Sequence, residues 1–163
     1  MLSTPKLDRI DVNILARLQQ NGRMTNITLA SEVGLSPSPC LARVKRLEKA
    51  GYISGYGAHL NLAKLGEAQL VFTSVTLGDH RREDFVRFEQ SIRSVNELVE
   101  CHLVSGGFDY LLKFMTRGIP HYQQVIDNLL DRKIGIAKYF TYIVIKSPIA
   151  KNHVPLEAIL FDD

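Results

Sequence analysis

The sequence has few cysteines, no long hydrophobic run and little net charge. Its 163 residues include two cysteines, Cys40 and Cys101, and 20 Lys or Arg side chains against 17 Asp or Glu. No apolar run approaches the roughly 18 residues that a membrane-spanning helix needs, and residues 1–7 hold no apolar segment of a secretory signal. We therefore expect a cytoplasmic protein with free thiols and no membrane partner.

The sequence also lacks the residue patterns of metal sites and of catalysis. Cys101 and His102 are neighbours on a predicted strand, so their side chains point to opposite faces and cannot chelate one ion together. No other Cys and His residues have the spacing of zinc ligands, and G-Y-I-S-G-Y-G at 51–57 lacks the Lys-Ser/Thr of a phosphate loop. We expect a buried Cys101 beside a surface histidine, no cofactor, no metal and no enzymatic activity.

The positive charge that is present lies near the start of the chain. Residues 1–55 carry eight Lys or Arg and four Asp or Glu, and the remainder is close to neutral. This asymmetry indicates a basic module joined to a neutral one, although a solvated basic surface is the alternative. The length allows either one compact domain or two small ones.

The first third of the chain contains three segments with helical periodicity. Residues 8–20 place four apolar side chains on one face, and a second, short helix ends at Gly34. The third helix begins in the run S-P-S-P, with Ser36 as its N-cap and Pro37 at its first position. Pro39 also falls in the first turn, where a helix has no hydrogen bond to lose. The two prolines therefore start this helix and do not break it.

The third helix has an apolar face, formed by Cys40, Leu41, Val44 and Leu47, and an opposite face that is small and polar at its start and basic behind. In a helix-turn-helix, the second helix meets base edges with its first residues and phosphates with basic ones. An amphipathic surface helix with a solvated basic face is the alternative. The predicted DNA contacts are Ser36, Ser38, Pro39, Ala42, Arg43 and Arg46 near the groove and Lys45 and Lys49 on phosphates.

The stretch G-Y-I-S-G-Y-G-A-H-L-N-L at 51–62 alternates loosely and is rich in glycine. It is typical either of the hairpin wing of a winged helix or of the start of a linker. We place the DNA-binding domain at 1–60 and the linker at 61–68.

Residues 69–146 alternate between strand and helix patterns in the order β-α-β-β-α-β, which predicts a ferredoxin-like unit and an α+β fold. Such a sheet has helices on one face, and its other face needs a cover, most simply a second copy of the chain. We therefore expect at least a homodimer. Residues 147–163 form a tail without an assigned role. Strands are predicted at 69–77, 97–104, 109–116 and 138–146, and helices at 81–93 and from Pro120 onward.

Four motifs add a family resemblance to this pattern. They are L-D-R-I-D-V-N-I-L at 7–15, G-L-S-P-S-P-C-L-A-R-V-K-R-L-E at 34–48, G-Y-I at 51–53 and C-H-L-V-S-G-G-F-D-Y-L-L-K at 101–113. Over residues 7–146 the chain resembles the leucine-responsive/asparagine-responsive (Lrp/AsnC) family of bacterial transcription regulators. The resemblance implies that the first domain binds double-stranded DNA. It also implies that the second binds an amino-acid effector between dimers, which commonly assemble to octamers.

The resemblance further implies an effector pocket around S-G-x-F-D. Backbone N–H groups of a Gly-Gly turn suit a carboxylate, and Asp109 suits an ammonium group. The alternative is a tight hairpin in which Asp109 bonds its own turn. Two positions depart from the family pattern. Gly107 affects the expected shape of the pocket, and Ile134-Gly135 affects a loop that the resemblance links to assembly. The implied effector residues are Leu103, Ser105, Gly106, Gly107, Phe108, Asp109, Ile119, Tyr142, Ile143 and Val144.

Together these features predict a sequence-specific DNA-binding transcription regulator of amino-acid metabolism that responds to an amino acid. A local regulator of one catabolic operon, such as one for proline or branched-chain amino acids, and a global regulator are both open. The alternative from another class is a ligand-binding assembly protein without specific DNA readout.

Overall fold

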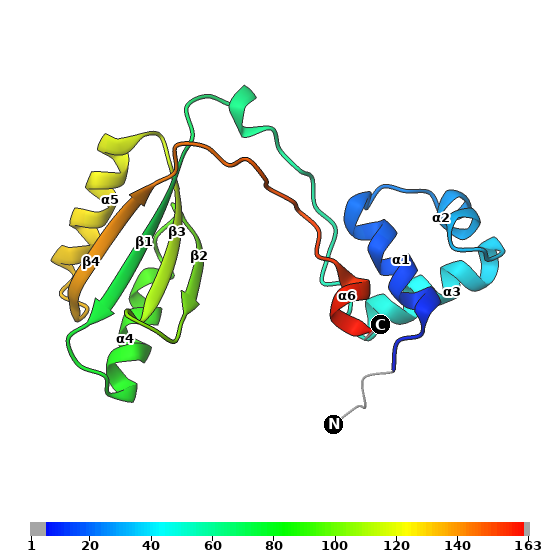
Figure 1. The fold of residues 1–163 in the computed structure, drawn as a ribbon, viewed down its shortest axis with the longest axis horizontal. Coiled ribbons are helices and arrows are strands. Elements are labelled where there is room, and N and C mark those ends of the chain that lie inside the picture. The colour runs from blue at the N-terminus through cyan, green and yellow to red at the C-terminus, as the bar shows by residue number, and fades with distance from the viewer. Residues whose placement is uncertain (1–5, 162–163) are drawn as a thin grey trace. The chain divides into compact units, whose positions relative to one another are not determined.

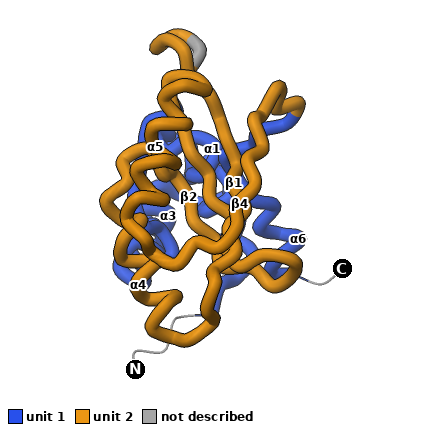
Figure 2. Tube along the Cα trace, turned by 90° about the vertical axis from the view of Figure 1, so that its left-hand side faces the viewer, with its two compact units in different colours: residues 1–59, 149–163 blue, residues 60–148 orange. Residues whose placement is uncertain are grey.

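The chain forms two compact units, which Figure 1 shows as ribbons and Figure 2 in two colours. The structure, a computed structural model, describes residues 6–161 apart from the side chain of residue 63. The first unit contains residues up to His59 together with those from Ile149 onward, and the second spans Leu60–Pro148. The C-terminal segment, to which the sequence assigned no role, therefore belongs to the unit that holds the N-terminal helices.

Three helices build the first unit: α1 (Arg9–Gln20), α2 (Asn26–Glu32) and α3 (Pro37–Lys49). Asp8 caps α1 in a capping box, in which each of Asp8 and Asp11 accepts a hydrogen bond from the backbone N–H of the other. Thr25 caps α2 by accepting from the backbone N–H of Thr28 at 3.2 Å. The capping residues satisfy N–H groups that have no partner inside the helix, which is why the helices begin where they do.

The turn between α2 and α3 fixes the start of the third helix. Gly34 has a φ of +71°, a left-handed conformation that glycine adopts without a steric penalty, and Leu35 then donates to the carbonyl of Ala30 at 2.8 Å. Ser36 occupies the N-cap position and Pro37 the first helical position, as predicted. The hydroxyl of Ser36 makes no capping hydrogen bond, so proline and the preceding turn define this helix start.

The core of the first unit is apolar and includes Cys40, which is fully buried as its place in the apolar stripe predicts. The same stripe was expected to include Leu41, and this is wrong, because 43% of Leu41 is exposed. Residues 53–61 contain no strand, so the predicted hairpin of a wing is not formed there. The buried members of this core are Ile14, Leu18, Leu29, Ala30, Cys40 and Leu47.

The second unit is a four-stranded antiparallel sheet with the order β2-β3-β1-β4. This confirms the predicted β-α-β-β-α-β succession. A short 3₁₀ turn, η1 (Leu62–Lys64), precedes the sheet. The elements are β1 (Gln69–Leu77), α4 (Arg82–Ile92), β2 (Leu98–Leu103), β3 (Tyr110–Thr116), α5 (Ile119–Asp131) and β4 (Ile136–Ile143).

Both helices of this unit cover the same face of the sheet (Figure 1), and the apolar residues of β1 and β3 that point toward them form the core with Phe88 and Ile126. The opposite face lacks such a cover within the described chain. There β4 exposes half of Phe140 and of Tyr142, at 52% and 53%. The alternation of buried and exposed residues along β3 is the period-two pattern of a sheet with one covered face.

Candidate DNA interface and effector site

The exposed face of α3 carries the residues predicted to contact DNA. Among the eight, Arg43 alone is half-buried, and the others are exposed. Small side chains lie at the start of the helix and cations behind them, as the helical spacing predicts. The side-chain amide of Asn26 at the start of α2 donates to the carbonyl of Pro37 at 2.8 Å, which fixes the beginning of α3 against the preceding helix.

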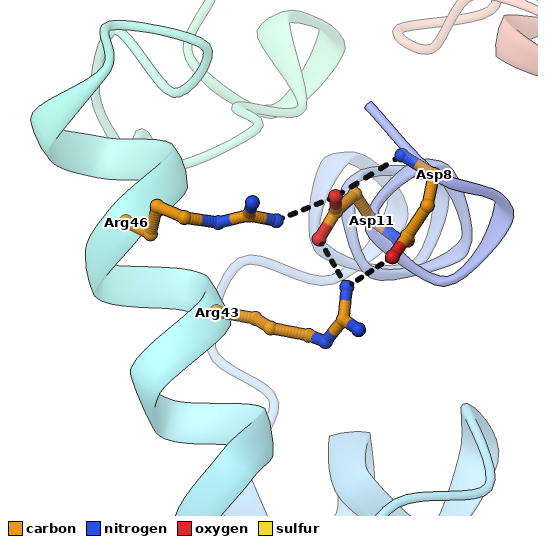
Figure 3. A network of polar contacts seen from close by, with 4 residues as sticks. All are labelled: Asp8, Asp11, Arg43 and Arg46. Atoms are coloured by element: carbon orange, nitrogen blue, oxygen red, sulfur yellow. Dashed lines mark hydrogen bonds and ion pairs between the residues drawn. The ribbon is translucent and has the colours of Figure 1, made fainter. Parts of the chain in front are cut away.

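The two arginines of this face are held by carboxylates of α1 (Figure 3). The Nη1 atom of Arg43 lies 2.7 Å from Oδ2 of Asp8 and 2.8 Å from Oδ1 of Asp11, and Nη2 of Arg46 contacts the other oxygen of Asp11. The side chain of Asp11 is only 1% exposed, whereas those of Arg43 and Arg46 are 28% and 44% exposed. A buried carboxylate thus orients two guanidinium groups at the surface.

This network changes the charge properties of its members. The hydrogen bond from Arg43, followed by that from the backbone of Asp11, holds the pKa of the Asp8 carboxyl below its usual range. The same carboxylates raise the pKa of the Arg43 guanidinium. One nitrogen of each arginine is used toward α1. A guanidinium has five N–H donors, so each retains donors for a phosphate or a base edge.

Asp8 is the N-cap of α1 and Asp11 lies in its first turn, but nothing in the sequence indicates the partners of these carboxylates. The partners lie 32 to 35 residues away from them, beyond the range of any helical periodicity. Lys45 and Lys49 are exposed, and no ion pair joins either to another described residue. No described carboxylate therefore competes with a DNA phosphate for their ammonium groups.

Asp109, the residue predicted to accept an ammonium group, lies at the start of β3 and bonds the neighbouring strand. Its Oδ2 accepts a hydrogen bond from the backbone N–H of Leu77 at 2.8 Å, and its own N–H donates to Val75 at 2.9 Å. The Nε2 atom of His80 lies 3.0 Å from Oδ1 and 3.1 Å from Oδ2. The carboxylate therefore does not cap its own turn.

His80 is the residue of this site that sequence reasoning missed. It follows β1 in the loop before α4, and its ring also lies near Phe85, with 6.0 Å between ring centroids. Nothing in the local sequence around His80 predicts the contact, because pairing of β1 with β3 brings residues 29 positions apart together. The side chain of His80 is 56% exposed and that of Asp109 is 17% exposed, so solvent and small ligands reach the pair from one side.

The ten predicted effector residues fall into two groups, one at the end of the sheet where β3 begins and one that extends from the middle of β4 to the other end. Leu103, the loop 105–108 and Asp109 lie where β2 ends and β3 begins. Ile119 follows the other end of β3, where Val144 donates to the carbonyl of Leu70 at 3.0 Å. The seven residues of β3 separate Asp109 from Ile119 by roughly 20 Å, whereas Tyr142 lies level with the middle of β3, on the far side of β1. One amino-acid molecule cannot touch both groups of the same chain.

The loop between β2 and β3 exposes its backbone. Ser105, Gly106 and Gly107 are exposed, and Gly106 has a φ of +153°, at the edge of the region open to glycine. No atom lies within 4 Å of where a Cβ of either glycine would stand. Backbone N–H groups in such a loop are available to a carboxylate, in keeping with the role that the resemblance implies.

Two further expectations concern metals and cysteines. Within residues 6–161 no group of three His, Cys, Asp or Glu side chains is placed to hold a metal ion. Cys101 pairs with Leu112 and His102 with Leu111, so the two neighbours do point to opposite faces. The expectation that Cys101 is buried is wrong: it is exposed on the edge strand β2, and its partial desolvation raises the pKa of its thiol to about 11. No helix in the described part of the chain is long and apolar enough to cross a membrane.

A helix-turn-helix with a basic exposed second helix, joined to a ferredoxin-like unit with one uncovered face, defines a DNA-binding protein with a regulatory domain. Comparisons with known proteins specify the family. Residues 7–54 match the model of the winged helix-turn-helix DNA-binding domain, and residues 70–154 match that of the Lrp/AsnC ligand binding domain. The chain belongs to the Lrp/AsnC family of transcription regulators, which are not enzymes.

Similar proteins span nearly the whole chain. The transcriptional regulatory protein DoeX of Halomonas elongata is 48% identical over 142 residues, which are 87% of this chain and 90% of that protein. The leucine-responsive regulatory protein of Escherichia coli is 42% identical over 93% of this chain and 92% of its own. The transcriptional regulator NMB0573 of Neisseria meningitidis, solved as a complex with L-Met, has a TM-score of 0.87 at 32% identity and covers 95% of this chain and 100% of its own.

Proposed function

We propose that this protein binds a specific DNA sequence through α3 and regulates transcription in response to a small amino acid bound by its second unit. As a regulator of transcription it acts in the cytoplasm, where bacterial DNA lies. The observation that carries the DNA half is the orientation of two surface arginines of α3 by a buried carboxylate. An unspecialised solvated helix has no need of such a network. In this proposal it positions Arg43 and Arg46 before DNA arrives.

The effector half rests on the exposed Gly-Gly loop and the Asp109 carboxylate, which offer opposite charges to the two ends of an amino acid. The two effector groups of one chain lie apart on its sheet. In our proposal the site is therefore completed by a second copy, which brings the end of its sheet with Ile119 and Val144 to the Asp109 end of the first. The relative solved with L-Met supports an amino acid as the class of ligand.

The uncovered face of the sheet supports a homodimer. It exposes about half of Phe140 and of Tyr142, and aromatic surface of this kind is most simply buried against a second sheet. Association of such dimers into octamers would then form the effector sites between dimers. Sedimentation velocity tests the subunit count. A monomer at all micromolar concentrations would contradict this part of the proposal.

The effector is tested by a thermal-unfolding panel with each common amino acid at millimolar concentration. A ligand that binds only the folded state at about a hundredfold excess over Kd stabilises it by about 2.7 kcal/mol. We expect a shift with one or a few amino acids, and we expect Asp109→Asn to abolish it. Asp131→Asn, on an exposed aspartate at the end of α5, is the matched control and should keep the shift. No shift with any amino acid would contradict the effector half.

The proposed DNA binding is tested by fluorescence anisotropy. The two kinds of probe are the promoter region of the gene that encodes this protein and random duplexes of equal length. Specific readout requires at least a thousandfold preference at physiological salt. Equal, weak binding to both would favour a ligand-binding assembly protein. Genome-wide occupancy then separates a local regulator, with one or a few sites beside a catabolic operon, from a global one.

A further inference from the structure

The C-terminal segment is part of the DNA-binding unit, although it follows the last strand of the ligand-binding unit. Residues from Ile149 onward belong to the first unit, and the helix α6 (Leu156–Leu160) packs on α1. The matched family domains end at residues 54 and 154, so α6 lies outside both. The chain therefore crosses between the two units twice. The first connection is formed by residues 60–68 and the second by residues 144–148.

Gln19 of α1 holds this segment by two hydrogen bonds. Its Nε2 donates to the carbonyl of Val154 at 2.8 Å, and its Oε1 accepts from the backbone N–H of Val154 at 3.1 Å. The side-chain amide thus pairs with one residue of the tail as a neighbouring strand would, which fixes the position of the tail along α1. The two residues are 135 positions apart in sequence, so no local propensity accounts for the contact.

Apolar contacts surround this pair. Val154 and Leu156 line a groove together with Leu15 and Leu18 of α1 and with residues 52–56, the segment that follows α3. At the end of the tail, the guanidinium carbon of Arg9 lies 5.7 Å from the centre of the Phe161 ring, a cation–π contact at the start of α1. The tail therefore contacts α1 near the start of the helix, at Arg9, and near its end, at Gln19.

The groove is also connected to α3. Tyr56, which lines it, donates its hydroxyl hydrogen to Oε1 of Glu48 at 2.9 Å, and burial followed by this carboxylate raises the pKa of the Tyr56 hydroxyl to about 12. Val154 and Leu156 of the tail therefore line the same groove as Tyr56, whose hydroxyl is bonded to the helix proposed to read DNA.

The other end of the tail begins at the proposed effector strand. β4 carries Tyr142 and Ile143, and Val144 follows it directly. Val144 donates to the carbonyl of Leu70, and its own carbonyl accepts from Nε2 of Gln69 at 2.9 Å. The two connecting segments therefore leave the sheet side by side. Both also reach the first unit at one groove, lined by residues 52–56 and by Val154.

We propose that residues 145–161 form a strap that docks on α1 and links the position of β4 to the DNA-binding unit. A unit held by two chain segments has fewer accessible orientations than a unit held by one, so a change at β4 reaches α1 through the strap as well as through the linker. The docking of the strap does not depend on the proposed function. Only the role of β4 as an effector strand rests on the proposed function.

The first test is amide hydrogen exchange of the full-length chain without DNA or amino acid. Docking predicts that the Val154 amide exchanges at least tenfold more slowly than an unstructured amide. Gln19→Leu should remove this protection. Gln124→Leu should not, because Gln124 is exposed on α5 of the other unit and its side chain makes no hydrogen bond within the described residues. An unprotected Val154 amide in the wild type, or unchanged protection in Gln19→Leu, overturns the strap.

A second variant alters the tail and leaves α1 intact. Val154→Pro removes the N–H that Gln19 accepts and should release α6, seen as faster exchange of residues 156–161. A protease site inserted at residues 61–66 provides a further readout. After cleavage, the fragment with α1–α3 should remain bound to the rest in the wild type. It should separate in Val154→Pro and in a chain that ends at Pro148. Separation in all three chains alike contradicts docking.

The regulatory meaning of the strap is measured separately. For an amino acid that raises the melting temperature of the wild type, Gln19→Leu should keep that shift while the effect of the amino acid on DNA affinity falls at least threefold. An unchanged effect contradicts a regulatory role for the strap. If no amino acid shifts the wild type, the proposed effector function has failed, and the exchange and cleavage results still decide whether the strap exists.

Discussion

The Nη1 atom of Arg43 lies 2.7 Å from Oδ2 of Asp8 and 2.8 Å from Oδ1 of Asp11, so a residue proposed to contact DNA is bound to the first helix. Asp11 is fully buried and also pairs with Arg46. A buried carboxylate is costly without partners, and here two cations and a backbone N–H satisfy it. The basic face of α3 and the packing of α1 on α3 therefore depend on the same side chain.

Asp11→Asn keeps the size of the side chain and removes its charge. We expect it to lower the free energy of unfolding by about 1–3 kcal/mol, because the hydrogen bonds that Arg43 and Arg46 donate to this buried side chain lose their charge-assisted character. Urea denaturation followed by circular dichroism measures the change. Asp8→Asn is the matched control, and since the side chain of Asp8 is 52% exposed we expect it to cost less than about 1 kcal/mol. Equal effects of the two variants would contradict a special role of the buried carboxylate.

The pH dependence of the Asp8 contribution has a defined sign. The pKa of Asp8 is lowered in the folded state, chiefly by Arg43, so its contribution is present above the usual Asp value of about 4 and is lost as pH falls through the folded value. The stability difference between wild type and Asp8→Asn should therefore be constant near neutral pH and shrink below about pH 4. Asparagine caps a helix as well as aspartate does, so the charge is the main change. Urea midpoints between pH 7 and pH 3 measure it, and a difference that grows on acidification would reverse the assignment.

Local sequence patterns were sufficient to predict the first five helices, the four strands and their order, but not α6 in the C-terminal tail. Residues 69–77 form β1 as predicted, because period-two alternation and β-branched side chains act over a few neighbouring residues. The contacts that define the candidate sites are of another kind. Asp11 with Arg46, His80 with Asp109 and Gln19 with Val154 join residues 35, 29 and 135 positions apart. No periodicity encodes such pairs, and the tertiary fold alone brings them together.

The family resemblance likewise does not predict how residues distant in sequence are arranged in space. It supplies the residues proposed for the effector site but not their arrangement, and in one chain Asp109 and Tyr142 lie on either side of β1 and several residues apart along it. The register explains the separation: Asp109 precedes Tyr110, which pairs with Val75, whereas Tyr142 pairs with Phe72, three residues before Val75 and on the other side of β1. A prediction about a site shared between chains needs the pairing of chains, which one sequence does not contain.

The cations of α3 should differ in what they contribute to DNA binding. Lys45→Ala removes an exposed ammonium group without an ion pair in the described residues, so we expect unchanged stability and a salt slope of log K reduced by about 1. Arg46→Ala also removes a partner of Asp11 and should lower both stability and DNA affinity. Anisotropy titrations over a range of salt concentrations, far below the melting temperature of each variant, separate the two effects. If Arg46→Ala relaxes specificity at a single base pair, it reads a base. If DNA binding is unchanged in both variants, α3 is not the DNA-contacting helix.

The hydroxyl of Tyr122 connects two strands inside the second unit. It lies 2.8 Å from Oγ1 of Thr73, which is fully buried, and 2.7 Å from Oγ1 of Thr141. Tyr122→Phe leaves the Thr73 hydroxyl without its partner, and we expect a loss of about 1–2 kcal/mol in urea denaturation. Adding Thr73→Val removes the unsatisfied group and should recover part of the loss. If the double variant is less stable than the sum of the single variants predicts, the hydroxyl pair is not the source of the effect.

We expect His80 and the ammonium group of the proposed effector to compete for the carboxylate of Asp109. Nε2 of His80 lies within 3.1 Å of both oxygens of Asp109, and one of these oxygens already accepts from Leu77, so the histidine takes acceptor positions that an ammonium group would otherwise use. His80→Ala should therefore tighten effector binding by about two- to tenfold, the value of one hydrogen bond of 0.5–1.5 kcal/mol, whereas Asp109→Asn weakens it. The side chain of His80 is 56% exposed, so its removal should not destabilise the fold. Titration of the amino acid identified by the thermal panel, followed by calorimetry, measures both variants. If His80→Ala weakens binding as much as Asp109→Asn does, the histidine holds the carboxylate in its binding position and does not compete for it.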